Sequence, residues 1–393
     1  MWIDSDRAFT TFCNEAAESP QIGIDLEFQG EGRYVPQLCL VQIATPSKIV
    51  AVDPFRVNIA PLGPILASPE VQKIFHAGTQ DIAILQRETG ITPVGVFDTQ
   101  IAAAFLGFGE SVGYVALVSR CLKVFLSKRQ QFTDWTRRPL NREQVDYALN
   151  DVRYLLSLSQ LLVEQLEQRQ RWDWVAEACA EMVTQALQTR TPEQAYLRFG
   201  KLAGLSRREL GVLRELAAWR EYTARAESRP VTTILGEDVM RQLCYVLPKT
   251  DAELRQIRGF KPNLPPSLRE EILAAIRSGL ALPESELPEP FQPRENDADA
   301  DTIASLLGAV VRAQATRLEL APALVSTRDE LVRLANWAAT QDPQSPLPDL
   351  NLLRGWRAAV VGNLLVDILR GKVGIRVDRR NPGSLAMLEL PEV

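Results

Sequence analysis

Two carboxylates, Asp25 and Glu27, lie two residues apart in the otherwise apolar stretch IGIDLEF. Residues two apart in a β-strand point to the same face, so these side chains would lie side by side. Burying two like charges together costs free energy, and the cost falls if divalent cations, which prefer carboxylate oxygens, lie between them. The pair is therefore a candidate metal site, although a strand with one solvated face would carry the same residues.

A third carboxylate, Asp81, follows a predicted strand in KIFHAGTQDIAIL and falls in the first turn of the next helix. Strand ends deliver side chains into the active sites of α/β proteins, so Asp81 could reach the same cleft. It could also do no more than interact with the helix dipole. His76 is the only histidine of the chain and cannot by itself form a histidine metal cluster. We expect His76 to pack or to orient groups beside the bound substrate.

Tyr147 and Asp151 lie four residues apart in VDYALNDVRYL, which places them one turn apart on one face of a predicted helix. A hydrolase that uses two metal ions needs carboxylates that hold cations roughly 3.5 to 4 Å apart, and a tyrosine hydroxyl beside them can orient the attacking water. Asp146 faces elsewhere on that helix, and Asp98 is explained as the N-cap of the helix that follows it. The candidate catalytic set is Asp25, Glu27, Asp81, Tyr147 and Asp151.

Basic and aromatic residues alternate in the segment SRCLKVFLSKRQQFTDWTRRPL, which suits binding to a single strand of nucleic acid. Arginine and lysine can follow the phosphates while aromatic rings stack on unpaired bases. The aromatic residues could instead pack in the core of the protein. The candidates for substrate contact, besides His76, are Phe132, Trp135, Arg137 and Arg138, joined by Phe28, which follows Glu27 directly.

The elements that must position these residues are those of an α/β fold. The runs QIGIDLEF, QLCLVQIA, KIVAVDP, VQKIFHA and VGVFDT are predicted strands, with helical patterns between and after them. Short polar breaks separate the first three runs, which predicts an antiparallel meander and therefore a mixed sheet. From Asn141 the apolar spacing predicts one long helix that reaches about Arg169, and another helix follows from about Trp172 to Gln188.

The chain beyond residue 205 is predicted to be helical apart from one linker. Residues 205–282 lack strand-like runs and are predicted to form a small all-helical unit, in which residues 207–280 hold 13 Lys and Arg against 10 Asp and Glu. Residues 283–298 are rich in Pro, Glu and Asp, cannot form a packed core and are predicted to be a linker. Helical patterns resume over residues 299–375, and residues 376–393 are predicted to be a tail.

The bulk properties fit a soluble enzyme of several domains. The 393 residues suggest two or three domains, and a net charge of −5 argues against a protein that coats nucleic acid by bulk charge. The five cysteines form no CxxC pair, so neither a zinc site nor a disulfide framework is predicted, and a reducing cytoplasm is the expected compartment. Because the N-terminus lacks a signal pattern and no run of about 18 apolar residues is present, we expect no membrane partner. We expect the protein to be a monomer.

The order DLEF, FHAGTQD and YALND resembles the motifs of the Asp-Glu-Asp-Asp 3′→5′ exonucleases, in the variant with a tyrosine in the third motif. The stretches GRYVPQLCLVQIA, VFDTQIAAAFLGFGESVGY and QFTDWTRRPL sharpen the resemblance to the ribonuclease D family, which is close over residues 20–170. ELGVLRELAAWREYTAR and ELRQIRGFKP resemble an HRDC (helicase and ribonuclease D C-terminal) domain, and ELAPALVSTRDELVRLANWAA resembles its second, divergent copy. The implied fold is a ribonuclease-H-like α/β exonuclease domain over residues 1–195, followed by two HRDC-type all-α domains.

By this resemblance Asp25, Glu27, Asp81 and Asp151 would bind two divalent cations, Mg²⁺ or Mn²⁺, and Tyr147 would position the attacking water. Hydrolysis would then release nucleoside 5′-monophosphates from the free 3′ end of an RNA without a protein nucleophile. The resemblance implies substrates such as the 3′ trailers of tRNA precursors and small structured RNAs. The HRDC-type units would assist RNA binding or serve as a scaffold.

Two alternatives are compatible with the same residues. A DNA 3′→5′ exonuclease of the proofreading or Werner-helicase type would use the same acids and tyrosine on a deoxyribose strand. The two helical units, and the lack of a polymerase or helicase motor in the sequence, favour RNA. The other alternative is a non-catalytic RNA-binding scaffold on the same fold, and the intact set of five residues speaks against it.

Overall fold

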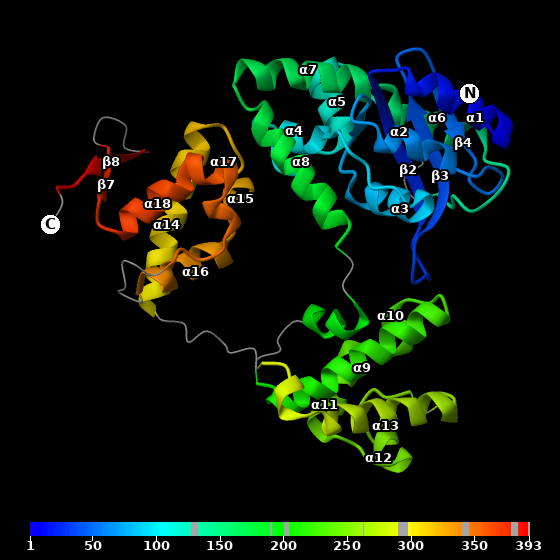
Figure 1. The fold of residues 1–393 in the computed structure, drawn as a ribbon, viewed down its shortest axis with the longest axis vertical. Helices are drawn as coiled ribbons and strands as arrows, with labels where there is room; N and C mark the ends of the chain where they lie inside the picture. The colour runs from blue at the N-terminus through cyan, green and yellow to red at the C-terminus, as the bar shows by residue number, and fades with distance from the viewer. Residues whose placement is uncertain are drawn as a thin grey trace. The chain divides into compact units, whose positions relative to one another are not determined.

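The computed structural model describes residues 1–126, 133–188, 191–199, 204–261, 263–289, 298–339, 346–378 and 384–391. These residues form two compact units, which are described separately below (Figure 1). The first unit contains residues 1–27, 38–187 and 296–393. The second unit contains residues 28–37 and 188–295.

A six-stranded mixed sheet forms the centre of the first unit, in the order β1-β4-β3-β2-β5-β6. Its strands are β1 Trp2–Ile3, β2 Gln21–Gln29, β3 Gln37–Ala44, β4 Ile49–Val52, β5 Gln72–Phe75 and β6 Val96–Asp98. β3 and β4 pair antiparallel, whereas β1–β4, β2–β5 and β5–β6 pair parallel, so the prediction of a mixed sheet is confirmed. The five predicted strands are all present, and the sequence missed only β1, which has two residues and no readable pattern.

The helices of this sheet domain follow the predicted alternation with the strands. The helices are α1 Asp6–Ala17, α2 Gly63–Ala67, α3 Thr79–Thr89, α4 Thr99–Phe105, α5 Tyr114–Leu122, α6 Arg142–Arg153, α7 Leu155–Gln168 and α8 Trp172–Ala186. Three of them contact different strands of the sheet: α6 packs on β4, α7 on β5 and α8 on β6. Strands covered by helices need apolar side chains on both faces, and β3 and β4 are accordingly buried along almost their whole length.

The prediction of one long helix from Asn141 is wrong, because the helix is broken at Tyr154 between α6 and α7. In an unbroken helix the backbone N–H of Tyr154 would donate to the carbonyl oxygen of Asn150, four residues earlier. The hydroxyl of Tyr114 lies between the two groups instead. It accepts from the Tyr154 N–H at 3.2 Å and donates to the Asn150 oxygen at 3.0 Å. A side-chain group inserted into the hydrogen-bond ladder in this way ends a helix.

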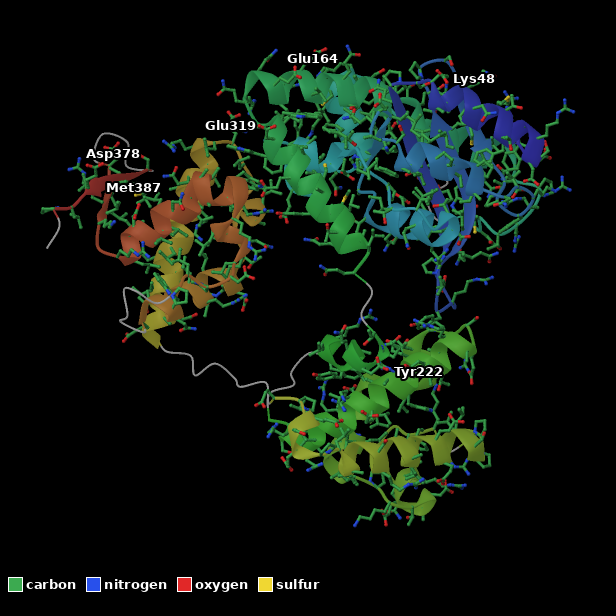
Figure 2. The ribbon with its side chains drawn as sticks, viewed as in Figure 1. Lys48, Glu164, Tyr222, Glu319, Asp378 and Met387 are labelled. Atoms are coloured by element: carbon green, nitrogen blue, oxygen red, sulfur yellow. The ribbon has the colours of Figure 1, made fainter. Side chains whose placement is uncertain are left out.

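Residues 298–391 of the first unit share a hydrophobic core with the sheet domain. Trp356 stacks on Trp174 of α8 with ring centroids 5.6 Å apart and meets Phe105 edge-on at 4.9 Å. The guanidinium of Arg171 donates to the carbonyl oxygens of Phe105, at 2.6 Å, and of Leu318, at 2.5 Å. The nearby carboxylate of Glu319, labelled in Figure 2, accepts from Arg169 at 2.5 Å. The helices here are α14 Ala298–Arg317, α15 Pro322–Val325, α16 Arg328–Ala339, α17 Gly355–Arg357 and α18 Asn363–Leu369, with a π-helical turn at Ala358–Gly362.

The C-terminal residues depart from the predicted tail. β7 Val373–Val377 and β8 Leu385–Glu389 pair antiparallel in a separate two-stranded sheet. Ile375, Leu385 and Met387 pack against the core of the first unit, which gives the hairpin an apolar face to bury. The alternation of Val, Ile and Val in VGIRV carried this signal, but five residues are too few to outweigh the polar residues around them.

In the second unit, the described residues of 205–282 form helices and no strand, as predicted. Its main helices are α9 Arg207–Ala226, α10 Val231–Ile234, α11 Glu237–Val246, α12 Asp251–Arg255 and α13 Pro266–Ala281, preceded by a 3₁₀ helix at Pro192–Arg198. α9 starts with a capping box, in which the Ser206 hydroxyl accepts from the Glu209 N–H and the Glu209 carboxylate accepts from the Ser206 N–H. α9 and α13 pack so closely that a Cβ at Gly279 would lie 2.5 Å from the Cα of Val212. The predicted linker lies partly outside the described residues.

Within the described part of the chain, no helix is both long and apolar enough to cross a membrane.

Candidate active site

Three of the predicted acids converge in the first unit. Asp25 and Glu27 lie on one face of β2, and Asp151 lies in the last turn of α6. One carboxylate oxygen from each lies within 4.8 Å of the others. Residues more than 120 positions apart in the chain therefore meet in one cluster, which only the packing of α6 against the sheet could bring about.

Asp81, in the first turn of α3, lies close enough to Asp25 and Glu27 for their charges to interact. It is only 7% exposed, and its pKa is raised first by burial and then by the charges of Asp25 and Asp98. Its helix is held in place by Asp98, whose carboxylate accepts from the Gly78 N–H at 2.8 Å and caps α4 through the N–H groups of Gln100 and Ile101. The predicted N-cap role of Asp98 is confirmed.

Tyr147 lies one turn before Asp151 on α6, and its hydroxyl is hydrogen-bonded to the Asp151 carboxylate. The helix begins at the predicted N-cap, Asn141, which forms a capping box with Gln144. Asp146 points away and pairs with Arg142 at the surface, at 3.7 Å, as its position on the helix predicted. The helix therefore presents one tyrosine and one acid to the cluster.

The pKa values of the acids in the cluster are raised above those of ordinary carboxylates. Burial raises the pKa of Asp25 to about 7 and that of Asp151 to about 8. The pKa of Glu27 rises to about 10, first because of burial and then because of the charges of Asp25, Asp151 and Asp81. Among the described residues, no lysine, arginine or histidine contributes a positive charge that would lower these pKa values. The cluster is a concentration of acidic groups whose charges the described basic residues do not offset.

Such a cluster fits divalent cations. Mg²⁺ and Mn²⁺ prefer hard oxygen ligands, and carboxylates that repel one another become favourable partners once a cation lies between them. Clusters of perturbed acids in a protein interior are a recurrent mark of functional sites. Their chemistry also suits two-metal hydrolysis, in which cations activate a water and stabilise the leaving oxygen of a phosphodiester.

The junction of α6 and α7 lies directly on β2, next to the cluster. A Cβ at Gly23 would meet the Leu156 side chain at 3.0 Å and that of Leu155 at 3.1 Å. Gly23 precedes Asp25 by two residues and therefore shares its face of the strand. The glycine lets the helix junction approach β2 closely, and this approach sets the distance between Asp151 and Asp25.

Arg138 was predicted to contact the substrate, but the structure places it in an internal role. Its guanidinium pairs with the buried carboxylate of Asp53 through two hydrogen bonds of 2.9 Å. Its remaining N–H groups donate to the carbonyl oxygens of Cys39, Trp135 and Arg137, at 2.6 to 2.9 Å. An arginine has five N–H donors, and all five are used here. Arg138 therefore holds the segment before α6 against the sheet and has no donor left for a phosphate.

Trp135 was also predicted to contact the substrate, by stacking on a base. It is only 3% exposed and packs against the ring of Tyr147, with centroids 6.2 Å apart. A ring so deeply buried supports the tyrosine and cannot receive a base, so the alternative of core packing is correct for Trp135. Phe132 lies outside the described residues.

The remaining predicted contacts differ in their surroundings. The Arg137 side chain is 83% exposed and pairs with Asp134 at 3.0 Å. Phe28 is half-buried at the end of β2, where strand alternation directs it away from the face that carries Glu27. His76 bonds to the Thr99 hydroxyl through Nδ1 at 2.9 Å, and its ring packs edge-on against Tyr114 at 5.6 Å. Because burial lowers the pKa of His76, its ring is neutral at pH 7.

Sequence reasoning missed two residues that organise this site, Tyr114 and Asp53. Tyr114 lies in VGY at the start of α5 and Asp53 follows β4, and neither has a motif neighbour that marks it. The Asp-Pro turn after a buried strand was the single available signal for Asp53. The interaction of Tyr114 with α6 spans 36 residues and leaves no trace in local spacing.

Comparisons with known proteins identify the family. Residues 1–167 match the family described as 3′-5′ exonuclease, and residues 209–276 match the HRDC domain. A ribonuclease D of Sphingobium indicum is 34% identical over 380 residues, which cover 95% of this chain and 96% of that protein. One from Gluconacetobacter diazotrophicus is 36% identical over 379 residues, covering 96% of this chain and 94% of that protein. The chain belongs to the ribonuclease D family.

The fold agrees with this membership of the ribonuclease D family. The crystal structure of Escherichia coli RNase D matches with a TM-score of 0.84 and 28% identity, covering 94% of this chain and 98% of that one. The first unit thus contains a ribonuclease-H-like exonuclease domain, and the second contains an HRDC domain. The chain is a hydrolytic 3′→5′ exoribonuclease that uses divalent cations. A DNA exonuclease of the proofreading type and a non-catalytic scaffold are not favoured.

Proposed function

We propose that Asp25, Glu27, Asp81 and Asp151 hold two Mg²⁺ or Mn²⁺ ions and that Tyr147 orients the water that attacks the terminal phosphodiester of an RNA. The observation that carries the proposal is the convergence of three carboxylates within 4.8 Å, with no described basic residue lowering the pKa of Glu27. Bound cations would activate the water and stabilise the leaving oxygen. The five cysteines are not exposed, and burial raises the pKa of Cys179 to about 12, so none of them is suited to act as a nucleophile.

The residues around the acids would orient the water and contact the RNA. The hydroxyl of Tyr147 stays protonated, because burial and the charges of Asp151 and Glu27 raise its pKa. It can therefore donate to the Asp151 carboxylate and accept from a water at the same time. Trp135 packs against the ring and restricts its motion. Arg137 is the proposed contact to the RNA backbone, with Phe132 as a further candidate, whereas Phe28, on the other face of β2, is not proposed to contact the terminal base.

The proposed substrates are RNAs with a free 3′ end, including tRNA precursors. Support comes from the Escherichia coli relative, whose crystal structure is described as that of an exoribonuclease involved in structured RNA processing. The HRDC unit, over residues 205–282, would hold the structured part of such an RNA while its 3′ strand reaches the acids. Its 13 basic against 10 acidic residues over 207–280 give it the opposite sign of charge to the chain as a whole.

We further propose a second, divergent HRDC-type domain over residues 299–375. The helices α14, α15, α16 and α18 support this assignment, and a rigid connection to α8 through Trp356 would keep it close to the exonuclease domain over residues 1–195. The five free cysteines fit a reducing cytoplasm, where we propose that the protein acts as a monomer.

The test of the catalytic set uses a labelled RNA with a 3′ extension and Mg²⁺. Asp25→Ala and Asp151→Ala should abolish trimming without changing the circular dichroism spectrum of the protein. Asp146→Ala is the matched control, since Asp146 lies on the same helix but faces away. Trimming at the wild-type rate by both Asp25→Ala and Asp151→Ala would show that the metal assignment is wrong.

Replacing Tyr147 by Phe separates the roles of water and metal. Trimming should slow by about 10- to 100-fold, in the range of other interactions that orient reacting groups, while Mn²⁺ binding stays within twofold of wild type. An unchanged rate would remove the tyrosine from the mechanism. A matched DNA strand measured beside the RNA tests substrate choice, because only RNA offers 2′-hydroxyl contacts.

A further inference from the structure

The break between α6 and α7 is built by one oxygen atom from outside the helix. The Tyr114 hydroxyl accepts from the Tyr154 N–H at 3.2 Å and donates to the Asn150 carbonyl at 3.0 Å, so it takes the place of the direct bond between them. Neither Asn150 nor Tyr154 is exposed. The Asn150 carbonyl accepts from this hydroxyl, and the Tyr154 N–H donates to it and to the Val152 carbonyl. The bridged turn contains Asp151, which follows Asn150 directly.

The hydroxyl is held firmly in this position. Tyr114 is the first residue of α5, and the turn before it is anchored by the Gln100 side chain, which donates to the Val112 carbonyl at 3.1 Å. The ring packs edge-on against His76, itself bonded to Thr99. Burial raises the pKa of Tyr114, and the charges of Asp151 and Asp25 raise it further, so the hydroxyl remains a donor at every relevant pH.

The break affects the position of the residues on both sides of it that lie near the proposed metal site. Before the break, α6 packs on β4 and carries Tyr147 and Asp151, whereas after it α7 packs on β5. In the sheet, β4 and β5 are separated by β3 and β2, so an uninterrupted helix would have to cover both ends along one axis. At the junction Leu155 and Leu156 lie on Gly23, two residues before Asp25.

We infer that Tyr114 is a positioning residue of the exonuclease, whose hydroxyl ends α6 and thereby sets Asp151 opposite Asp25 for cation binding. His76 acts one step further back, by fixing the ring of Tyr114. This inference rests on the proposed metal-binding role of the two acids. It assigns a function to a histidine and a tyrosine that do not themselves reach the carboxylates' ligand atoms.

Tyr114→Phe tests the inference by removing the single oxygen and keeping the ring. The Asn150 carbonyl would then lose this donor, and the Tyr154 N–H would either bond directly to Asn150 or keep only its bond to the Val152 carbonyl. Either change shifts the turn that holds Asp151. Partners behind metal ligands typically change metal affinity or activity by about 10- to 100-fold when they are lost. We expect a loss of that size in Mn²⁺ affinity, measured by calorimetry on the full chain without RNA. We expect an equal or larger loss in kcat for RNA trimming, with KM for RNA within about twofold.

Tyr154→Phe is the matched control, because it removes a hydroxyl from the neighbouring tyrosine and keeps the backbone N–H. It should bind Mn²⁺ and trim RNA like wild type. Thermal unfolding verifies that Tyr114→Phe is folded at the assay temperature, and titrations are run in the cold if its melting temperature is low. A role limited to stability would lower the melting temperature and leave Mn²⁺ affinity and kcat of the folded protein unchanged.

The outcomes separate this inference from the proposed function. If wild type binds Mn²⁺ and Asp25→Ala does not, but Tyr114→Phe binds with wild-type affinity, the positioning role is refuted and the metal site stands. If Asp25→Ala binds Mn²⁺ as wild type does, the metal assignment fails and the role of Tyr114 fails with it. Weaker Mn²⁺ binding by Tyr114→Phe with Tyr154→Phe unchanged supports the inference.

Discussion

The acid cluster should make the metal-free protein less stable as the pH rises, and one substitution can measure this effect. Asp25 has a pKa of about 7 in the folded protein, against 3.8 for an unperturbed aspartate. Between these two values the folded state keeps a proton that the unfolded state releases, so the free energy of unfolding falls with rising pH. Below pH 4 both states are protonated and Asp25 contributes nothing.

The size of the effect follows from the two pKa values. Each pH unit of difference corresponds to about 1.4 kcal/mol, so the difference of about three units gives at most about 4 kcal/mol. Asp25 is coupled to its acidic neighbours, which share the same protons, so we expect about 2 to 4 kcal/mol at pH 8. Asp25→Asn removes this charge and should be the more stable protein at pH 8 in EDTA, with the gain shrinking towards pH 4.

Divalent cations should make wild type more stable than Asp25→Asn, which is the reverse of the order in EDTA. A ligand that binds only the folded state raises its stability in proportion to the logarithm of its concentration above Kd, and Asp25→Asn lacks a principal ligand. Wild type should therefore gain more stability from millimolar Mg²⁺ than the variant does. Urea unfolding at pH 5 and pH 8, with EDTA and with Mg²⁺, measures all four combinations. A variant that is less stable than wild type at pH 8 in EDTA would refute the electrostatic reasoning.

Two further substitutions test the supports of α6. Arg138→Gln leaves the Asp53 carboxylate buried without its partner and should lower the free energy of urea unfolding by about 3 to 5 kcal/mol. The control Arg137→Gln, at an exposed position, should change it by no more than about 0.5 kcal/mol. Equal losses in the two variants would contradict the internal role of Arg138. Gly23→Ala places a Cβ at 3.0 Å from the Leu156 side chain, so the junction of α6 and α7 must move away from β2. We expect kcat for RNA trimming to fall by about tenfold or more. A wild-type kcat would show that the junction does not set the geometry of the acids.

Much of the catalytic set was readable in the sequence because it depends on local geometry. The spacing of two residues puts Asp25 and Glu27 on one face of a strand, and the spacing of four puts Tyr147 above Asp151 on a helix. The cap residue Asn141 and the N-cap Asp98 were predicted for the same reason, since each bonds to backbone within three residues. Short-range hydrogen bonds and periodicity are properties of the chain segment itself.

The substrate contacts were predicted less well, because composition does not show where a side chain points. Trp135 and Arg138 lie in a basic and aromatic segment that suits a nucleic acid strand, yet both are directed inward. Their partners, Tyr147 and Asp53, lie 12 and 85 residues away in the chain. The guanidinium of Arg138 uses its donors on a buried carboxylate and three carbonyl oxygens, so it cannot bind a substrate in solution. No local sequence pattern predicts such distant partners.

The sequence thus determined which local elements carry the four acids and the tyrosine, together with the mixed sheet and the helices of residues 205–282. Only the tertiary structure decided how the acids meet. The amphipathic pattern runs on from α6 into α7, and the break between them comes from a hydroxyl 36 residues earlier than Asn150, in a different helix. Local pattern specifies which face of an element is apolar, whereas the end of that element and its distance from another depend on groups that only folding brings together.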